Sequence, residues 1–386
     1  MISKNLKKTF YPPIVSVNEQ ILELKQKGFE IINMGQAVVN LNPPQNFIET
    51  LNKFYQDKRM HYYSPDIGYP FFRENLLHFL NKHFNSNIKN IDNLLITAGA
   101  NQGVSTLLMT ILEPEDEVII PAPYYFNHIM AVDMLGAKNI IINTKIKNNF
   151  QLKLEDIEKY YSPKTKAIIL VTPNNPTGLT YNKKETEKII QFCEEKNILL
   201  IFDETYNLIF FNEKQSFIDK FKNNGNIAIV GSFSKSFAIA GWRIGYILLP
   251  DYLIKDYIKV QDTFIISPSS PAQLFLNEYL EKSEEYLINI NTVLKNRANL
   301  LYNNLNKKEQ TIFPEGGCFL WYKLPNTNKT SAELAFSLLE KYKVAVIPGE
   351  VFGNSYKNYW RISFGSVDED DIKLGAEIIN NFFDLY

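Results

Sequence analysis

The stretch AIILVTPNNPTGLTYNKKETEKIIQFCEEKNILLIFDETY, residues 167–206, carries the pattern that decides the fold. Two short runs rich in branched aliphatic residues enclose a turn and a longer polar stretch of helical character. Similar runs, LLIT, EVII, NIIIN, IAIVG and IGYILL, stand at residues 94–97, 117–120, 139–143, 227–231 and 244–249. This alternation of strand and helix signals predicts an α/β sheet whose strands are largely parallel.

A second region has a different pattern. Residues 268–306 are long and helical in character, and GGCFLWYKL, KVAVIPG and YWRISFG then predict short separate strands before a closing helix. We therefore expect three segments: an N-terminal arm and part of a small domain in residues 1–44, a large domain in 45–280, and a small α+β C-terminal domain in 281–386. The arm is predicted to lie across the second domain or a partner subunit.

Composition excludes several classes of function. The 386 residues carry a formal charge of −1 without blocks of like charge, which argues against binding to nucleic acid or to a membrane surface. We find no apolar run approaching the roughly 20 residues that span a bilayer. Only Cys193 and Cys318 are present, and four scattered histidines offer no spacing typical of a metal site. We expect a cytoplasmic globular protein without a metal.

The segment SFSK, residues 232–235, comes directly after a predicted strand, and AGWRIG follows at 240–245. Ligand groups gather at the carboxyl ends of strands in α/β sheets. Lys235 could be an ordinary solvated loop lysine. However, lysine amines also form Schiff bases with carbonyl cofactors, and pyridoxal 5′-phosphate (PLP) is a common partner. Arg243 and Ser232 would then supply a charge and a hydroxyl to the cofactor phosphate.

At this point the sequence resembles the class I/II aminotransferases of PLP fold type I, the group that includes aspartate, aromatic and kynurenine aminotransferases. The resemblance covers nearly the whole chain. It rests on motifs that occur in the family's order: HYYSPDIGYPFFRE, TAGANQG, PAPYYF, TPNNPTG, IFDETY, SFSKSFAIAGWRIGY, PEGGCFLW and YWRISFG. The resemblance implies a large PLP-binding domain with a mostly parallel sheet between helices, and a smaller α+β domain.

The resemblance also implies roles for residues around the cofactor ring. Lys235 would carry PLP, and Asp203 would pair with the pyridinium nitrogen and keep the ring an electron sink. Tyr206 and Asn175 would bind the phenolic oxygen. Simpler interpretations stay open, because Asp203 could cap a helix and Asn175 could serve only the Asn-Pro turn.

Further residues match the positions that hold the phosphate and the ring face. The turn formed by Gly99, Ala100 and Asn101 joins a predicted strand to a helix, and free amides at such a turn can bind phosphate, although many α/β proteins have this turn without a ligand. Tyr125, in preference to Tyr124, matches the ring that stacks on the cofactor. Tyr63 matches a tyrosine that reaches the phosphate of the neighbouring subunit, which implies at least a homodimer.

The substrate would be held by Arg361, Asn175 and the loop containing Gln36 and Ala37. Arg361 lies in a predicted half-buried strand, where a charge needs a partner. That partner could be an inter-strand carboxylate or, as in the family, the substrate α-carboxylate in a bidentate pair. Residues 34–40, MGQAVVN, depart from the family's Gly-x-Pro-Asp-Phe type of segment, with Ala37 at the usual glycine.

We therefore predict an aminotransferase that moves an amino group from an L-amino acid to a 2-oxo acid by a ping-pong mechanism. The departure at residues 36–40 leaves open another PLP enzyme on the same scaffold: a carbon–sulfur β-lyase, a cyclase, or an oxygen-using oxidase or hydroxylase. A PLP-binding regulatory module fits less well, because we expect the fold to begin almost at residue 1, without room for an N-terminal helix-turn-helix, and because the charge is balanced. A catalytically dead relative is disfavoured by the intact set of Lys235, Asp203, Tyr206, Arg243 and Arg361.

Overall fold

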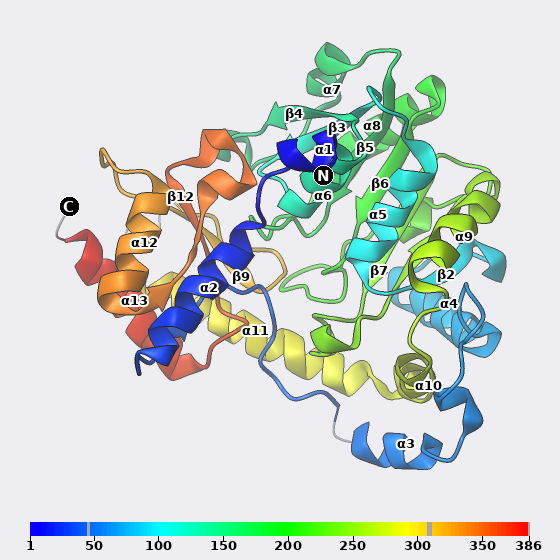
Figure 1. Ribbon diagram of the computed structural model, residues 1–386, viewed down its shortest axis with the longest axis horizontal. Coiled ribbons are helices and arrows are strands. Elements are labelled where there is room, and N and C mark those ends of the chain that lie inside the picture. Colours follow the sequence, from blue (N-terminus) through cyan, green and yellow to red (C-terminus); the bar gives the residue numbers. More distant parts are fainter. Residues whose placement is uncertain (45–46, 307–310, 385–386) are drawn as a thin grey trace.

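The computed structural model describes residues 1–44, 47–306 and 311–384. Its large part is built on a seven-stranded sheet and its smaller part on a three-stranded sheet (Figure 1). The α-helices of the described residues are α1 (Lys4–Lys8), α2 (Pro13–Gln26), α3 (Phe47–Phe54), α4 (Pro70–Phe84), α5 (Ala100–Ile111), α6 (Phe126–Met134), α7 (Leu154–Tyr160), α8 (Lys183–Lys196), α9 (Asp251–Ile265), α10 (Ser270–Tyr279), α11 (Glu284–Asn304), α12 (Ser331–Tyr342) and α13 (Glu369–Phe383). The strands are β1 (Ile32–Asn33), β2 (Leu94–Thr97), β3 (Glu117–Ala122), β4 (Lys138–Asn143), β5 (Thr165–Val171), β6 (Leu199–Asp203), β7 (Ile227–Ser232), β8 (Gly245–Leu248), β9 (Phe319–Lys323), β10 (Val344–Ala345), β11 (Ile347–Pro348) and β12 (Tyr359–Ser363).

The large sheet has the strand order β2-β8-β7-β6-β5-β3-β4, and each of its strands coincides with one of the runs identified in the sequence. β8 runs antiparallel to both of its neighbours, whereas the other pairs are parallel. Gly245, where β8 begins, therefore lies beside Thr97 and Ser232, where β2 and β7 end. The ends of the parallel strands and the start of β8 meet at one edge of the sheet.

Both faces of this sheet are buried, which explains why its strands are apolar throughout rather than alternating. In β6, Leu200 and Phe202 pack into the core on one side, and Leu199 and Ile201 pack into the core on the other. The first polar side chain of this strand, Asp203, comes at its carboxyl end. The strand thus delivers a single carboxylate to the edge where the loops converge.

The smaller sheet has the order β11-β12-β9, with β12 in the middle and antiparallel to both neighbours. Arg361 lies at the centre of β12, opposite Trp321 on β9 and Ile347 on β11. The helical region expected at residues 268–306 forms α10 and α11, and α11 runs from the large part toward the smaller one (Figure 1).

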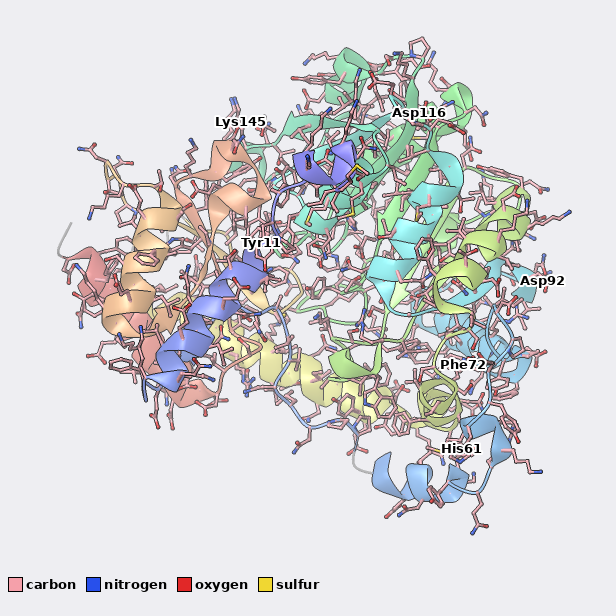
Figure 2. All side chains as sticks on the ribbon, in the orientation of Figure 1. Tyr11, His61, Phe72, Asp92, Asp116 and Lys145 are labelled. Carbon is pink, nitrogen blue, oxygen red and sulfur yellow. The ribbon has the colours of Figure 1, made fainter. Side chains whose placement is uncertain are left out.

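The N-terminal segment contacts both parts of the molecule (Figure 1). On the large part, the Asn5 side chain near α6 donates a hydrogen bond to the carbonyl of Met134 at 3.4 Å. On the smaller part, Ile21 of α2 packs with Leu339 and Ala345. Tyr11 stands just before α2 (Figure 2) and donates a hydrogen bond to Glu19 at 3.0 Å. The domain boundaries after residues 44 and 280 stay a prediction.

Among the described residues, we find no helix that combines the length and the apolar character needed to cross a membrane.

Candidate active site

A cavity of about 340 Å³ opens at the edge of the large sheet where the strands end, a size typical of small-molecule sites. Its charged lining residues are Asp203, Lys235, Arg243 and Arg361. The neutral residues that line it are Ile14, Gln36, Ala37, Val38, Ala100, Asn101, Tyr125, Val171, Asn175, Thr205, Tyr206, Ser232 and Ser234. Residues more than 300 positions apart in the sequence therefore form one site.

Asp203 is buried at the floor of the site and is held by three groups. The amide and hydroxyl of Thr205 donate to its Oδ1 at 3.0 and 2.6 Å. Nε2 of the buried His128 lies 3.1 Å from its Oδ2. Burial alone would raise the pKa of Asp203, but His128 and Thr205 together hold that pKa below its ordinary value. The side chain is thus kept as an anion, and because a turn follows it, Asp203 does not cap a helix.

Glu204, the next residue, is also buried but does not line the cavity. Its carboxylate accepts hydrogen bonds from the amide of Phe217 at 2.6 Å and from the hydroxyl of Ser216 at 2.5 Å. Burial raises the pKa of Glu204 to about 7. Adjacent residues at a strand end point in opposite directions, so only Asp203 of this acidic pair serves the site.

Lys235 follows β7 and points into the cavity, where no described carboxylate forms an ion pair with it. Burial lowers the pKa of its amine, and the charges of Arg361 and Arg243 lower it further, against an opposing effect of Cys318. A lysine in such surroundings has a larger neutral fraction at neutral pH and is therefore a better nucleophile and base. These properties do not fit an ordinary solvated loop lysine.

The Gly99 turn and Arg243 form one end of the cavity. Gly99 has a φ of +83°, and a Cβ atom there would lie 2.5 Å from Nη2 of Arg243, so only glycine fits. Arg243 donates to the carbonyls of Ala98 and Ala240 at 3.2 and 3.0 Å. Ala100 begins α5 and lines the cavity, so the positive end of the helix dipole lies at this end of the cavity together with Arg243. This combination suits a phosphate group.

Arg361 is fully buried, and no described carboxylate forms an ion pair with it, so the inter-strand salt bridge does not form. Its Nη1 donates to Asn175 Oδ1 at 3.0 Å and its Nη2 donates to the carbonyl of Gly35 at 2.6 Å. Its buried Nε has no hydrogen-bond partner. The guanidinium is held by neutral acceptors and keeps an unused donor, which leaves its charge available for an anionic ligand.

The unusual loop at residues 36–40 is anchored at both ends. Nε2 of Gln36 donates to Asn18 on α2 at 3.0 Å. Oδ1 of Asn40 accepts from Arg297 on α11 at 2.6 Å, and the amide of Asn40 donates to the carbonyl of Gly365 at 2.9 Å. Gln36 and Ala37 both line the cavity, as expected for substrate-contacting residues.

Two of the expected site residues do not line the cavity. Gly99 borders the site through Arg243 without lining the cavity, and Tyr63 lies outside it, with 77% of its surface exposed. Tyr125 lines the cavity, whereas Tyr124 packs into the hydrophobic cores. Tyr206 and Ser232 are buried and line the cavity.

Sequence reasoning missed His128, Thr205, Ser234, Val171, Ile14 and Val38. Thr205 had a local signal, because an Asp followed two residues later by a hydroxyl residue is typical of a side-chain-capped turn. His128 had a weaker one, its position one helical turn beyond Tyr125. Ile14 had none, because its approach depends on the packing of α2 against a distant part of the chain.

The comparisons with known proteins identify the family of the chain. The family model for aminotransferase class I and II matches residues 30–379. The chain is 30% identical to aromatic-amino-acid aminotransferase 2 of Thermococcus litoralis, with 91% of each protein covered. It is 31% identical to an aspartate aminotransferase of Pyrococcus abyssi, with 88% of each covered. The solved structure of an aspartate aminotransferase from Thermotoga maritima superposes with a TM-score of 0.91 at 25% identity, covering 99% of this chain and all of that one.

The fold and the site together define an enzyme of the PLP fold type I, with a mostly parallel sheet and a smaller antiparallel one. The chain belongs to the class I and II aminotransferases. It is therefore an enzyme of PLP-dependent amino-group transfer, and the relatives do not favour the alternative reactions on the same scaffold.

Proposed function

We propose that this chain binds PLP in the cavity described above and uses Lys235 as the attachment point. Arg243, Ser232 and the Gly99, Ala100 and Asn101 turn would hold the phosphate. Asp203 would pair with the ring nitrogen. The ring face would rest on Tyr125, and the phenolic oxygen would accept hydrogen bonds from Tyr206 and Asn175.

The observation that carries this proposal is the charge balance of the cavity. Three cationic side chains and one carboxylate line it, and that carboxylate lies 3.1 Å from Nε2 of His128. Arg361 is fully buried and Lys235 is half-buried, whereas Arg243 is exposed. Cationic side chains without carboxylate partners, buried ones above all, are stabilised when a ligand supplies the anions. A phosphate at Arg243 and a substrate carboxylate at Arg361 would supply them, and this is the pairing that PLP and an amino acid bring.

The protein's own groups can then perform the transfer. When bound, the cofactor supplies an aldehyde carbon that takes up the amino group and a ring that withdraws electrons. Arg361 and Asn175 would fix the substrate α-carboxylate, which orients the Cα–H bond. Lys235, once released by the incoming amine, would take the proton from Cα and return one at the next step. The anionic Asp203 would keep the ring nitrogen protonated throughout.

Kinetics with two substrates test this proposal. Because the amino group stays on the enzyme between the two halves of the reaction, double-reciprocal plots at several fixed concentrations of the 2-oxo acid should be parallel. Each 2-oxo acid released should match one amino acid formed. Intersecting lines, release of ammonia, or a requirement for oxygen would contradict the proposal and favour another reaction on this scaffold.

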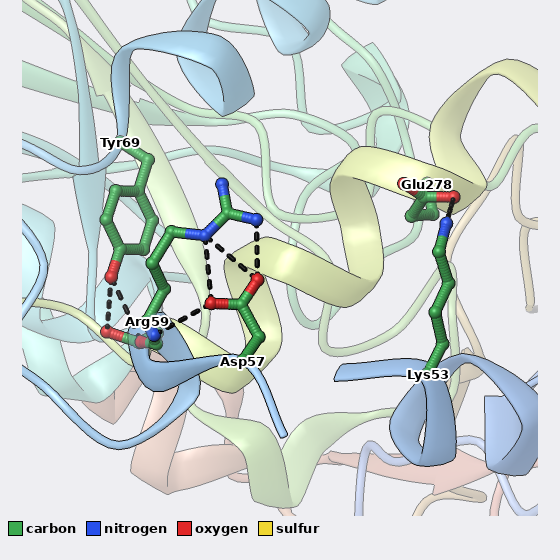
Figure 3. A network of polar contacts seen from close by, with 6 residues as sticks. Lys53, Asp57, Arg59, Tyr69 and Glu278 are labelled. Atoms are coloured by element: carbon green, nitrogen blue, oxygen red, sulfur yellow. Dashed lines mark hydrogen bonds and ion pairs between the residues drawn. The ribbon is translucent and has the colours of Figure 1, made fainter. Parts of the chain in front are cut away.

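We also propose that two copies of this chain form the active unit, with Tyr63 of each reaching the other's phosphate site. Two contacts hold the segment just before Tyr63: Arg59 pairs with Asp57 at 2.5 Å, and the carbonyl of Arg59 accepts a hydrogen bond from Tyr69 (Figure 3). Directly before Tyr63, the Tyr62 carbonyl accepts a hydrogen bond from Ser270. Lys53 of α3 likewise pairs with Glu278 of α10 at 2.8 Å (Figure 3).

The surface near this segment supports the same proposal. Tyr62 and Tyr63 are 66% and 77% exposed, and Phe264 and Ile266 near the end of α9 are 59% and 46% exposed. Ile266 also adopts a φ of +61°, which is strained for a β-branched residue. Exposed aromatic groups close to a strained backbone are typical of an interface that a second copy covers.

A hybrid dimer tests whether Tyr63 serves the partner's site. In the hybrid, one subunit carries Tyr63→Ala and the other carries Lys235→Ala, and two different tags allow its purification. If Tyr63 acts across the dimer, one site combines the Lys235 of the first subunit with the Tyr63 of the second, and the other site lacks both residues. At limiting PLP we expect about half of the wild-type activity per dimer, above that of either parent variant. If the activity of the hybrid, divided by its number of intact Lys235 residues, did not exceed that of the Tyr63→Ala homodimer, the shared site would be contradicted.

Two free, buried cysteines, Cys193 and Cys318, suit a reducing compartment, and on this ground we propose that the enzyme acts in the cytoplasm with amino acids and 2-oxo acids as its substrates.

A further inference from the structure

The charges that line the cavity all have a role in the proposed function. Lys235, Arg243 and Arg361 would serve the cofactor aldehyde, the phosphate and the α-carboxylate, and Asp203 would serve the ring nitrogen. Within the described residues of one subunit, no further cationic side chain lines the cavity. A second carboxylate on the substrate would therefore find no unassigned cation on the subunit whose Lys235 lines the cavity.

The N-terminal segments that reach the cavity are mostly apolar and form one wall of it. They contribute Ile14 from α2 and Ala37 and Val38 from the loop after β1. Figure 1 shows α2 beside the smaller part of the molecule, and its packing through Ile21 fixes it there. The polar member of this wall, Gln36, already donates its side-chain amide to Asn18 at 3.0 Å.

Desolvation decides which side chains this wall accepts. A carboxylate placed against Ile14, Ala37 and Val38 would lose water without gaining a charge partner, and burying such a group is costly. An apolar side chain would gain from the same burial, and an amide would lose far less than an ion. The names of the relatives do not settle the matter, because they include both aspartate and aromatic aminotransferases.

We propose that the preferred amino donor of this enzyme carries an uncharged side chain, held against Ile14, Ala37 and Val38, and that acidic donors are discriminated against. This inference rests on the proposed function of the site, since it presumes that Arg361 holds the α-carboxylate and that Lys235 carries PLP.

Rapid mixing of the PLP-loaded enzyme with single amino acids measures the preference in one half-reaction, from the loss of visible cofactor absorbance. Asparagine and aspartate are isosteric and differ in charge, so their ratio isolates the charge effect. We expect the second-order rate constant for asparagine to exceed that for aspartate at least about tenfold, and leucine to exceed asparagine. Aspartate equal to or faster than asparagine would overturn the inference and leave aminotransferase activity intact. Failure of every donor would instead overturn the proposed function.

Binding without chemistry gives a second readout. Succinate and succinamate are another isosteric pair, and each can place one carboxylate on Arg361. By calorimetry on the PLP-loaded enzyme, succinamate should bind at least about tenfold more tightly than succinate. Tighter binding of succinate than of succinamate would by itself overturn the inference.

A charge added to the wall should reverse the preference. In Ile14→Lys the asparagine-to-aspartate ratio should fall at least about tenfold, because the new ammonium can pair with the substrate carboxylate. Leu22→Lys adds the same charge to an exposed position, 57% accessible, on the same helix and should leave the ratio unchanged. Equal effects of the two substitutions would contradict a role for the wall.

Discussion

Lys235→Ala should lose at least about 10³-fold in kcat, because one amine is proposed both to attach the cofactor and to move the substrate proton. The variant should still bind PLP, since the phosphate and ring contacts remain, but reversibly, so that dialysis removes the cofactor. Absorbance after dialysis and steady-state turnover measure the two effects separately.

Lys235→Arg is the matched control for charge. It keeps a cation beside Arg243 and Arg361 but cannot attach the cofactor or act as a base at neutral pH, since guanidinium stays protonated. We expect it to be as inactive as Lys235→Ala. If either variant retained more than about a tenth of the wild-type kcat, the assignment of Lys235 would be wrong.

Asp203→Asn should lower kcat by about 10²-fold to 10⁴-fold while the fold and PLP binding persist. The amide is nearly the same size but carries no charge, so it cannot stabilise a proton on the ring nitrogen. In the native chain His128 and Thr205 keep the pKa of Asp203 low, so the carboxylate stays ionised as the pH falls toward its ordinary titration range. Turnover of saturated enzyme measures the loss.

Glu204→Gln provides a neighbouring control. Glu204 is equally buried but faces away from the cavity, and its pKa of about 7 means that a neutral group already occupies this position for much of the time near neutral pH. The glutamine can still accept from the Phe217 amide, so kcat should change by less than about threefold. Asp256→Asn, on the exposed face of α9, controls for a surface charge. Equal losses in Asp203→Asn and Glu204→Gln would show that Asp203 has no special role.

Much of the large sheet could be predicted from the sequence because its strands are buried on both faces and are therefore continuously apolar. In β6, Leu200 and Phe202 pack into one core, and Leu199 and Ile201 pack into the other. The continuous apolar run of these residues therefore predicts a strand. Asp203 then stands out as the first polar residue. The convergence of Lys235, Asn175 and Arg361 could be predicted from the family resemblance, and all three side chains line the same cavity.

What could not be predicted depends on packing between distant segments. β8 is a short, buried run like the parallel strands of the sheet, and nothing in its residues indicates that it runs in the opposite direction. His128 becomes relevant only because α6 places it 3.1 Å from Asp203. Ile14 enters the site because α2 packs on the smaller part, and no local pattern signals such a contact. The reach of Tyr63 into a partner's site stays a prediction.

An absorbance titration of the purified, PLP-loaded enzyme tests the central claim most directly. Addition of an amino acid with an uncharged side chain, such as leucine, in the absence of oxygen should convert the yellow form of the enzyme to a colourless one and release one equivalent of 2-oxo acid. Addition of a 2-oxo acid should then restore the yellow band. A yellow band that no amino acid in a panel including leucine and aspartate changes, or one that is lost with release of ammonia and is not restored, would contradict the claim that this chain transfers amino groups through Lys235.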